Sequence, residues 1–125
     1  MSIKRGEIYY IQGLPVTRGS EQAGNRPAIV VSNDTGNRFS SVIEVVYVTT
    51  AQKSPMPTHF DVNSTPKPSV ALCEQIHSIS KSRILSCCGK LTPDEMNALD
   101  NALKISLALH ERQSGEAEKG VLCCG

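Results

Sequence analysis

The strongest constraint on the fold is a β-prone stretch in the first half of the chain. Residues 42–50, Val-Ile-Glu-Val-Val-Tyr-Val-Thr-Thr, are dominated by β-branched and aromatic side chains, which fit a pleated, largely buried surface. Weaker segments of the same kind, bounded by turn residues, occur at 7–12, 27–32, 58–62, 70–79 and 84–91. We expect each of them to form a strand, with a turn or a single helical turn at 33–37.

One helix is expected near the C-terminus. Thr92-Pro93-Asp94-Glu95 has the pattern of a capping box with proline at the first helical position. Two neighbouring apolar stripes follow at helical spacing, Met96, Leu99, Leu103 and Leu107, and Ala98, Ala102, Ile105 and Leu109. So wide an apolar face predicts burial against a sheet, extended by a subunit interface. The predicted class is mainly β with α (α+β), compatible with a small, strongly bent, barrel-like antiparallel sheet.

The bulk properties predict one folded domain. The chain has 125 residues, of which 39% are hydrophobic and 20% charged, within the range of globular proteins. We expect a domain at 1–110 and a flexible polar tail at 111–125. No apolar run approaches the length of a membrane span and the N-terminus has no signal-peptide core. A cytoplasmic location, no membrane association and reduced thiols are therefore expected.

The five cysteines do not have the spacing of a zinc site. Cys87-Cys88 and Cys123-Cys124 are adjacent pairs, and adjacent side chains on a strand point to opposite faces, which makes joint chelation awkward. We expect no metal and no cofactor. Cys73, Cys87 and Cys88 are interpreted as strand residues, some of them buried.

A polar, glycine-punctuated loop ends at an arginine that carries the main functional signal. In Gly19-Ser20-Glu21-Gln22-Ala23-Gly24-Asn25-Arg26-Pro27, the proline pushes Arg26 into extended geometry. The guanidinium therefore projects from the root of a rigid strand, where its donor fork suits a phosphate. Residues 1–91 hold ten Lys/Arg against six Asp/Glu, whereas 92–125 hold three against six. This asymmetry favours a polyanionic partner near Arg26, although it is also compatible with ordinary surface charge.

Ordered fragments along residues 3–109 resemble the MazF/PemK/Kid toxins of toxin–antitoxin systems. They are Lys4–Tyr9, Gly19–Pro27, Ser32-Asn33-Asp34, Thr49-Thr50, Glu74-Gln75-Ile76 and Ile105-Ser106-Leu107. The resemblance implies an SH3-like barrel, a homodimer and a metal-independent endoribonuclease that cuts single-stranded RNA at short sequences. It also implies neutralisation by a cognate antitoxin whose acidic, extended segment occupies the RNA groove.

The same resemblance assigns the site. It implies that Arg26 and Thr49 are the catalytic pair and that Glu74 is the acidic residue of the site. RNA contacts are expected from Ser20, Glu21, Gln22, Asn25, Thr50, Gln75 and His77. Many family members have an arginine where this chain has His77, which affects the local phosphate contact and the sequence preference. His59 is a second histidine of interest, in a segment where residues 51–69 contain four of the seven prolines.

Metal-independent ribonucleases use the 2′-hydroxyl of the substrate as nucleophile and leave a 2′,3′-cyclic phosphate and a 5′-hydroxyl. Because a guanidinium stays protonated, Arg26 is assigned to charge stabilisation, Thr49 to a hydroxyl contact, and Glu74 or Glu21 to proton removal. The alternatives are a surface ion pair for Arg26, a plain strand residue for Thr49 and solvated charges for both glutamates.

Two other functions remain open. Toxins of the same fold poison DNA gyrase without being nucleases, but they act through a tryptophan near the C-terminal helix end, and this chain has no tryptophan. A catalytically inactive module that binds RNA or the antitoxin is the other alternative.

Overall fold

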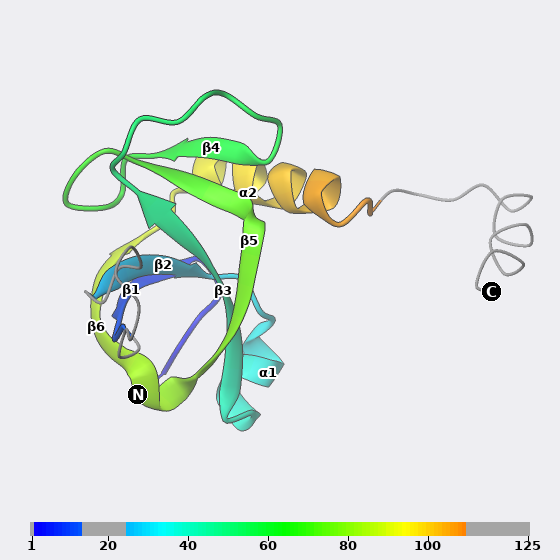
Figure 1. The fold of residues 1–125 in the computed structure, drawn as a ribbon. Helices are drawn as coiled ribbons and strands as arrows, with labels where there is room; N and C mark the ends of the chain where they lie inside the picture. Colours follow the sequence, from blue (N-terminus) through cyan, green and yellow to red (C-terminus); the bar gives the residue numbers. More distant parts are fainter. Residues whose placement is uncertain (1, 14–24, 110–125) are drawn as a thin grey trace, which may run out of the picture.

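The computed structural model describes residues 2–13 and 25–109 (Figure 1). The elements, in chain order, are β1 (Glu7–Ile11), β2 (Arg26–Val30), α1 (Asp34–Phe39), β3 (Val42–Thr49), β4 (His59–Val62), β5 (Ser69–Ser80), the 3-10 turn η1 (Lys81–Arg83), β6 (Ile84–Lys90) and α2 (Pro93–Ser106). Every predicted strand is present, with ends that differ from the prediction by one or two residues. The expected turn after β2 is a six-residue helix, α1. The expected tail at 111–125 lies outside the described residues.

The six strands form one antiparallel sheet in the order β4-β5-β3-β2-β1-β6. Three other strands lie between β5 and β6 in this order, yet the three residues of η1 connect β5 to β6 along the chain. So short a connection requires the sheet to curl until the two strands are close, and Figure 1 shows this curl. The strongly bent sheet is therefore confirmed; in the described residues β4 and β6 remain its edges, so the barrel is not closed.

Both faces of the central strands are buried. One core lies between the sheet and α2, and Ile29, Val46 and Leu99 belong to it. The other fills the inside of the curl and includes Ala28, Val45 and Tyr47. Because successive side chains alternate between these two cores, β2 and β3 consist of almost continuous apolar runs.

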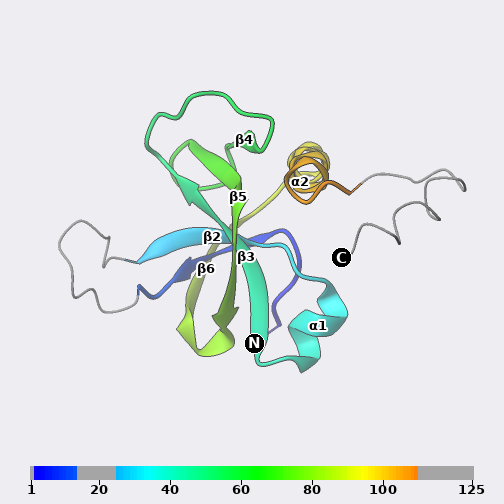
Figure 2. The ribbon, with the colours of Figure 1, turned by 45° about the vertical axis from the view of Figure 1, so that its right-hand side comes forward.

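Helix α2 begins as its capping box predicts. The Thr92 hydroxyl accepts a hydrogen bond from Glu95 N–H and the Glu95 carboxylate accepts one from Thr92 N–H. The helix contacts β4 and β5, while α1 contacts β3 (Figures 1 and 2). Leu99, Ala102 and Leu103 are buried, whereas Leu107 is 53% exposed. Burial against the sheet is thus confirmed as far as Leu103, and the extension of this apolar face by a subunit interface stays a prediction.

Strand β5 bends sharply in its middle. Val46 pairs with Ile76, but Val48 pairs with Ala71, so the register shifts between these two pairs. A shift of this kind bends the strand and re-aims its side chains. Glu74 and Gln75, neighbours in the chain, are therefore both exposed.

The cysteines of the described residues lie in strands as expected. Cys73 is buried, Cys88 is half-buried and Cys87 is exposed, and all three are free thiols. Burial raises the pKa of Cys73 to about 12, so its thiol is unreactive at neutral pH. No described helix is long and apolar enough to cross a membrane.

Candidate active site

Arg26 lies at the first residue of β2, on the rim of the curled sheet. It pairs with Ile11 of β1 and is half-buried. Alternation places its side chain on the same face as Ala28, which belongs to the inner core. The guanidinium carbon lies 4.5 Å from the centre of the Tyr47 ring. The described ion pairs do not include Arg26.

Thr49 ends β3 on the same rim. Ala28 pairs with Tyr47 and Val30 with Val45, and the same register continued by two residues sets Arg26 opposite Thr49. The Thr49 hydroxyl oxygen accepts a hydrogen bond from Ala51 N–H at 3.1 Å. Its own proton therefore remains available for an incoming oxygen. The observed pairs of β2 with β3 end at Ala28 and Tyr47, so Arg26 and Thr49, which the family resemblance pairs, lie at the ends of neighbouring strands just beyond them.

Glu74, at the bend of β5, has different partners. Its Oε2 lies 2.8 Å from His59 Nε2, and its Oε1 accepts a hydrogen bond from the Thr58 hydroxyl at 2.9 Å. Partial desolvation alone would raise the pKa of Glu74, but the bonds from His59 and Thr58 outweigh it and lower the pKa. Within the described residues no hydrogen bond joins Glu74 to Arg26 or Thr49.

The remaining predicted contacts divide into two groups. Asn25, Thr50, Gln75 and His77 are exposed, so their side chains are accessible to a ligand. The Asn25 side chain also accepts a hydrogen bond from Gly13 N–H at 3.4 Å. Ser20, Glu21 and Gln22 lie outside the described residues.

Sequence analysis missed a second cation on the rim. Arg83, at the end of η1, donates from Nε and Nη2 to the carbonyl of Gln12, at 3.0 and 2.8 Å. Gln12 follows the last residue of β1, whose partner in β2 is Arg26. Because Arg83 binds a carbonyl rather than a carboxylate, its charge adds to that of Arg26 and favours an anion at this end of the sheet.

Two further contacts were also not foreseen. Tyr47 touches Arg26 and, with ring centres 5.0 Å apart, His77; alternation in β3 could have placed it beside Thr49. The ion pair of His59 with Glu74 had no signal in the sequence, because fourteen residues separate them along the chain and only the pairing of β4 with β5 brings them together.

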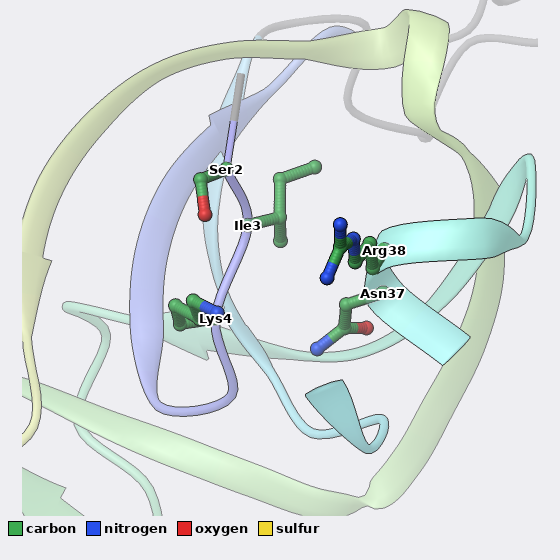
Figure 3. A pocket seen from close by; sticks show the side chains of 5 residues that line it. All are labelled: Ser2, Ile3, Lys4, Asn37 and Arg38. Atoms are coloured by element: carbon green, nitrogen blue, oxygen red, sulfur yellow. The ribbon is translucent and has the colours of Figure 1, made fainter. Parts of the chain in front are cut away.

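A cavity of about 390 Å³ lies elsewhere, between the N-terminal segment and α1 (Figure 3). Its lining residues are Ser2, Ile3, Lys4, Asn37 and Arg38. None of them is a predicted site residue. Across residues 2–13 and 25–109, no three His, Cys, Asp or Glu side chains are grouped as metal ligands would be.

Comparisons with known proteins agree with this fold. The family model described as "PemK-like, MazF-like toxin of type II toxin-antitoxin system" matches residues 4–107. The Endoribonuclease EndoA of Bacillus subtilis (strain 168) is 42% identical over 114 residues, which cover 87% of this chain and 97% of that protein.

Solved structures of other proteins have the same fold. An endoribonuclease in complex with its cognate antitoxin, from Mycobacterial species, superposes with a TM-score of 0.72 at 26% identity, over 88% of this chain and 99% of that one. A MazF from Deinococcus radiodurans has the same fold, with a TM-score of 0.71 at 21% identity over 87% of this chain and 99% of that one. The chain therefore belongs to the PemK-like, MazF-like toxins of type II toxin–antitoxin systems.

Proposed function

We propose that this protein is an endoribonuclease toxin that cleaves single-stranded RNA at the rim formed by Arg26 and Thr49. The observation that carries the proposal is the pairing of Ala28 with Tyr47, because the same register continued by two residues sets Arg26 across from Thr49. The Thr49 hydroxyl accepts a hydrogen bond from Ala51 N–H and can still donate one. Family membership and the relative named an endoribonuclease support it.

Each residue has one role in the proposed reaction. The substrate 2′-hydroxyl attacks the adjacent phosphorus and its proton passes to a base. The bond from phosphorus to the 5′-oxygen breaks, and this oxygen takes a proton from water, which gives a 2′,3′-cyclic phosphate and a 5′-hydroxyl. Arg26 stabilises the negative charge that develops on the phosphorane, and Thr49 donates to a non-bridging oxygen. The protein needs no metal in this scheme.

We assign proton removal to Glu74, with Glu21 as the alternative. The lowered pKa of Glu74 keeps its carboxylate ionised at neutral pH, the state that a general base requires, but it also makes this carboxylate a weaker base than an ordinary glutamate. We propose RNA contacts for residues that lie near Arg26, Thr49, Glu74 or Glu21 in sequence, namely Ser20, Gln22, Asn25, Thr50, Gln75 and His77.

The partner, oligomeric state and location that we propose for the protein follow from its family. A homologous endoribonuclease has been solved in complex with its cognate antitoxin, and we propose that an antitoxin inhibits this protein as well. We further propose a homodimer in the cytoplasm, where mRNA is accessible. Ile105, Leu107 and Leu109 at the end of α2 are each more than half exposed and offer an apolar surface for such contacts.

The experiment incubates the purified protein and its R26A and T49A variants with a mixed-sequence RNA in EDTA and maps the cut ends. Cleavage by the wild-type protein and a loss of about 10²–10³-fold in turnover for R26A support the proposal. A folded R26A variant with full activity contradicts it. Intact RNA combined with gyrase inhibition would favour the gyrase-directed alternative, and intact RNA that is bound would favour an inactive module.

A further inference from the structure

The guanidinium of Arg26 lies over the face of an aromatic ring. Its carbon is 4.5 Å from the ring centre of Tyr47, within the range of a cation–π contact. We propose that Tyr47 is a positioning residue that holds Arg26 at the rim with all of its N–H donors free for the phosphate. This inference rests on the proposed function, because it assumes that Arg26 acts on RNA.

The pairing of β2 with β3 places Tyr47 next to Arg26. Tyr47 pairs with Ala28, so Arg26 is its diagonal neighbour two residues along β2, a distance that long side chains span. Tyr47 is 8% exposed and belongs to the core inside the curl. A buried ring is a fixed platform, whereas a free arginine side chain populates many rotamers. The contact with this fixed ring therefore restricts the rotamers that the Arg26 side chain populates.

The chemistry of the contact suits a residue that must bind an anion. A carboxylate partner would orient Arg26 equally well, but it would occupy the donor fork and neutralise the charge. The face of a ring attracts the cation without accepting its in-plane N–H groups. Among the described residues no carboxylate pairs with Arg26.

A second ring supports the platform. The His77 ring of β5 packs against Tyr47 with centres 5.0 Å apart and planes at 69°, an edge-to-face geometry that is favourable for aromatic pairs. His77 pairs with Val45, two residues before Tyr47. Arg26, Tyr47 and His77 thus form a row of contacts across β2, β3 and β5.

The test is a mutant cycle in the full-length protein. Y47L removes the ring, and we expect kcat to fall by about 3- to 30-fold, with a smaller change in KM, because the ring positions Arg26, which acts in the charge-developing step. In an R26A background the same change should have no further effect on kcat. Y47F keeps the ring and deletes a hydroxyl for which the described residues provide no hydrogen bond, so it should restore the rate.

The matched control is Y9L. Tyr9 is a second tyrosine of the same core, 5% exposed, and its loss should lower stability without changing kcat in the folded protein. If Y47L slows the R26A variant by the same factor as the wild type, or if Y47F is as slow as Y47L, the inference is wrong. If R26A itself cleaves at the wild-type rate, the proposed function fails instead.

A second measurement does not depend on activity or on the folding of Y47L. In NMR spectra of the wild-type protein, the side-chain protons of Arg26 should show nuclear Overhauser effects to the Tyr47 ring and upfield ring-current shifts, both retained in Y47F. Absence of these effects in the wild type would directly contradict the proposed contact between Arg26 and Tyr47.

Discussion

His59 and Glu74 form an ion pair that fastens a loop to the bend of β5. The Nε2 atom of His59 lies 2.8 Å from Glu74 Oε2, and its Nδ1 lies 3.2 Å from the Ser54 carbonyl oxygen. The His59 ring therefore links the loop of residues 51–57 to Glu74.

We predict that H59Q loosens this loop. The His59 side chain is 8% exposed, and loss of a largely buried ring with a charge-assisted bond should cost about 1–3 kcal/mol of unfolding free energy. Denaturant titration measures the cost. In H59Q, hydrogen exchange should be faster at the backbone N–H of residue 59, which donates to the Met56 carbonyl in the wild type. H77Q makes the same change on an exposed ring and should cost less; equal costs would contradict the linking role of His59.

Acid should weaken the attachment of α2 to the sheet. The Glu95 carboxylate accepts hydrogen bonds from Ser64 Oγ and from Thr92 and Asn63 N–H. Although desolvation opposes them, these bonds lower the pKa of Glu95. A lowered pKa contributes stability above the unfolded value, near 4.5, and this contribution is lost as pH falls through the folded value.

Thermal melts of the wild type and E95Q test this expectation. At pH 7 the variant should have the lower Tm, and the difference should shrink as pH falls below about 4.5. The D94N variant changes a neighbouring carboxylate in the same first helical turn, and should show a smaller difference at pH 7. A gap between wild type and E95Q that is constant with pH would refute the role of the Glu95 charge.

Gly89 is required by a close backbone contact. A Cβ atom at this position of β6 would lie 2.1 Å from the Ser64 carbonyl oxygen, which is backbone and cannot move alone. We expect G89A to lower the unfolding free energy by about 1–3 kcal/mol. G36A is the matched control, because its Cβ would meet the Asn33 side chain at 3.4 Å, and helix propensity favours alanine in α1. Equal stability of G89A and wild type in urea titrations would show that this contact is absent.

RNA binding should weaken with salt. Each phosphate that a cation neutralises on a single strand contributes a slope of about −0.7 to the plot of log affinity against log salt. R26A should therefore flatten the slope by about this amount. K104A removes a lysine from α2, away from the rim, and should leave the slope unchanged. An R26A slope identical to that of the wild type would mean that Arg26 does not meet a phosphate in the complex.

Local sequence patterns predicted most of the fold. The β-prone runs located all six strands within one or two residues, and the Thr92–Glu95 box located the start of α2. The sequence did not predict the bend of β5, because a register shift depends on pairing with β3. Ile105 and Leu107 continue the apolar face of α2 beyond the region that the sheet covers, and their burial in a subunit interface stays a prediction.

The proposed catalytic pair came from the family resemblance and stays a prediction. Arg26 begins β2 and Thr49 ends β3, so both residues lie at the ends of adjacent strands. The partners of Glu74 were not predictable, because they come from β4 and the preceding loop. The platform role of Tyr47 also required coordinates, since only the diagonal geometry shows that its ring lies under Arg26.

The most direct test of the account uses an RNA that contains one cleavage site. With EDTA present, the wild-type protein should cut it to a 2′,3′-cyclic phosphate and a 5′-hydroxyl. The same RNA with a single 2′-deoxy substitution at the nucleotide before the scissile bond should bind but stay intact. Cleavage of the deoxy-substituted RNA at the wild-type rate would contradict attack by the 2′-hydroxyl, and with it the roles assigned to Arg26 and Thr49.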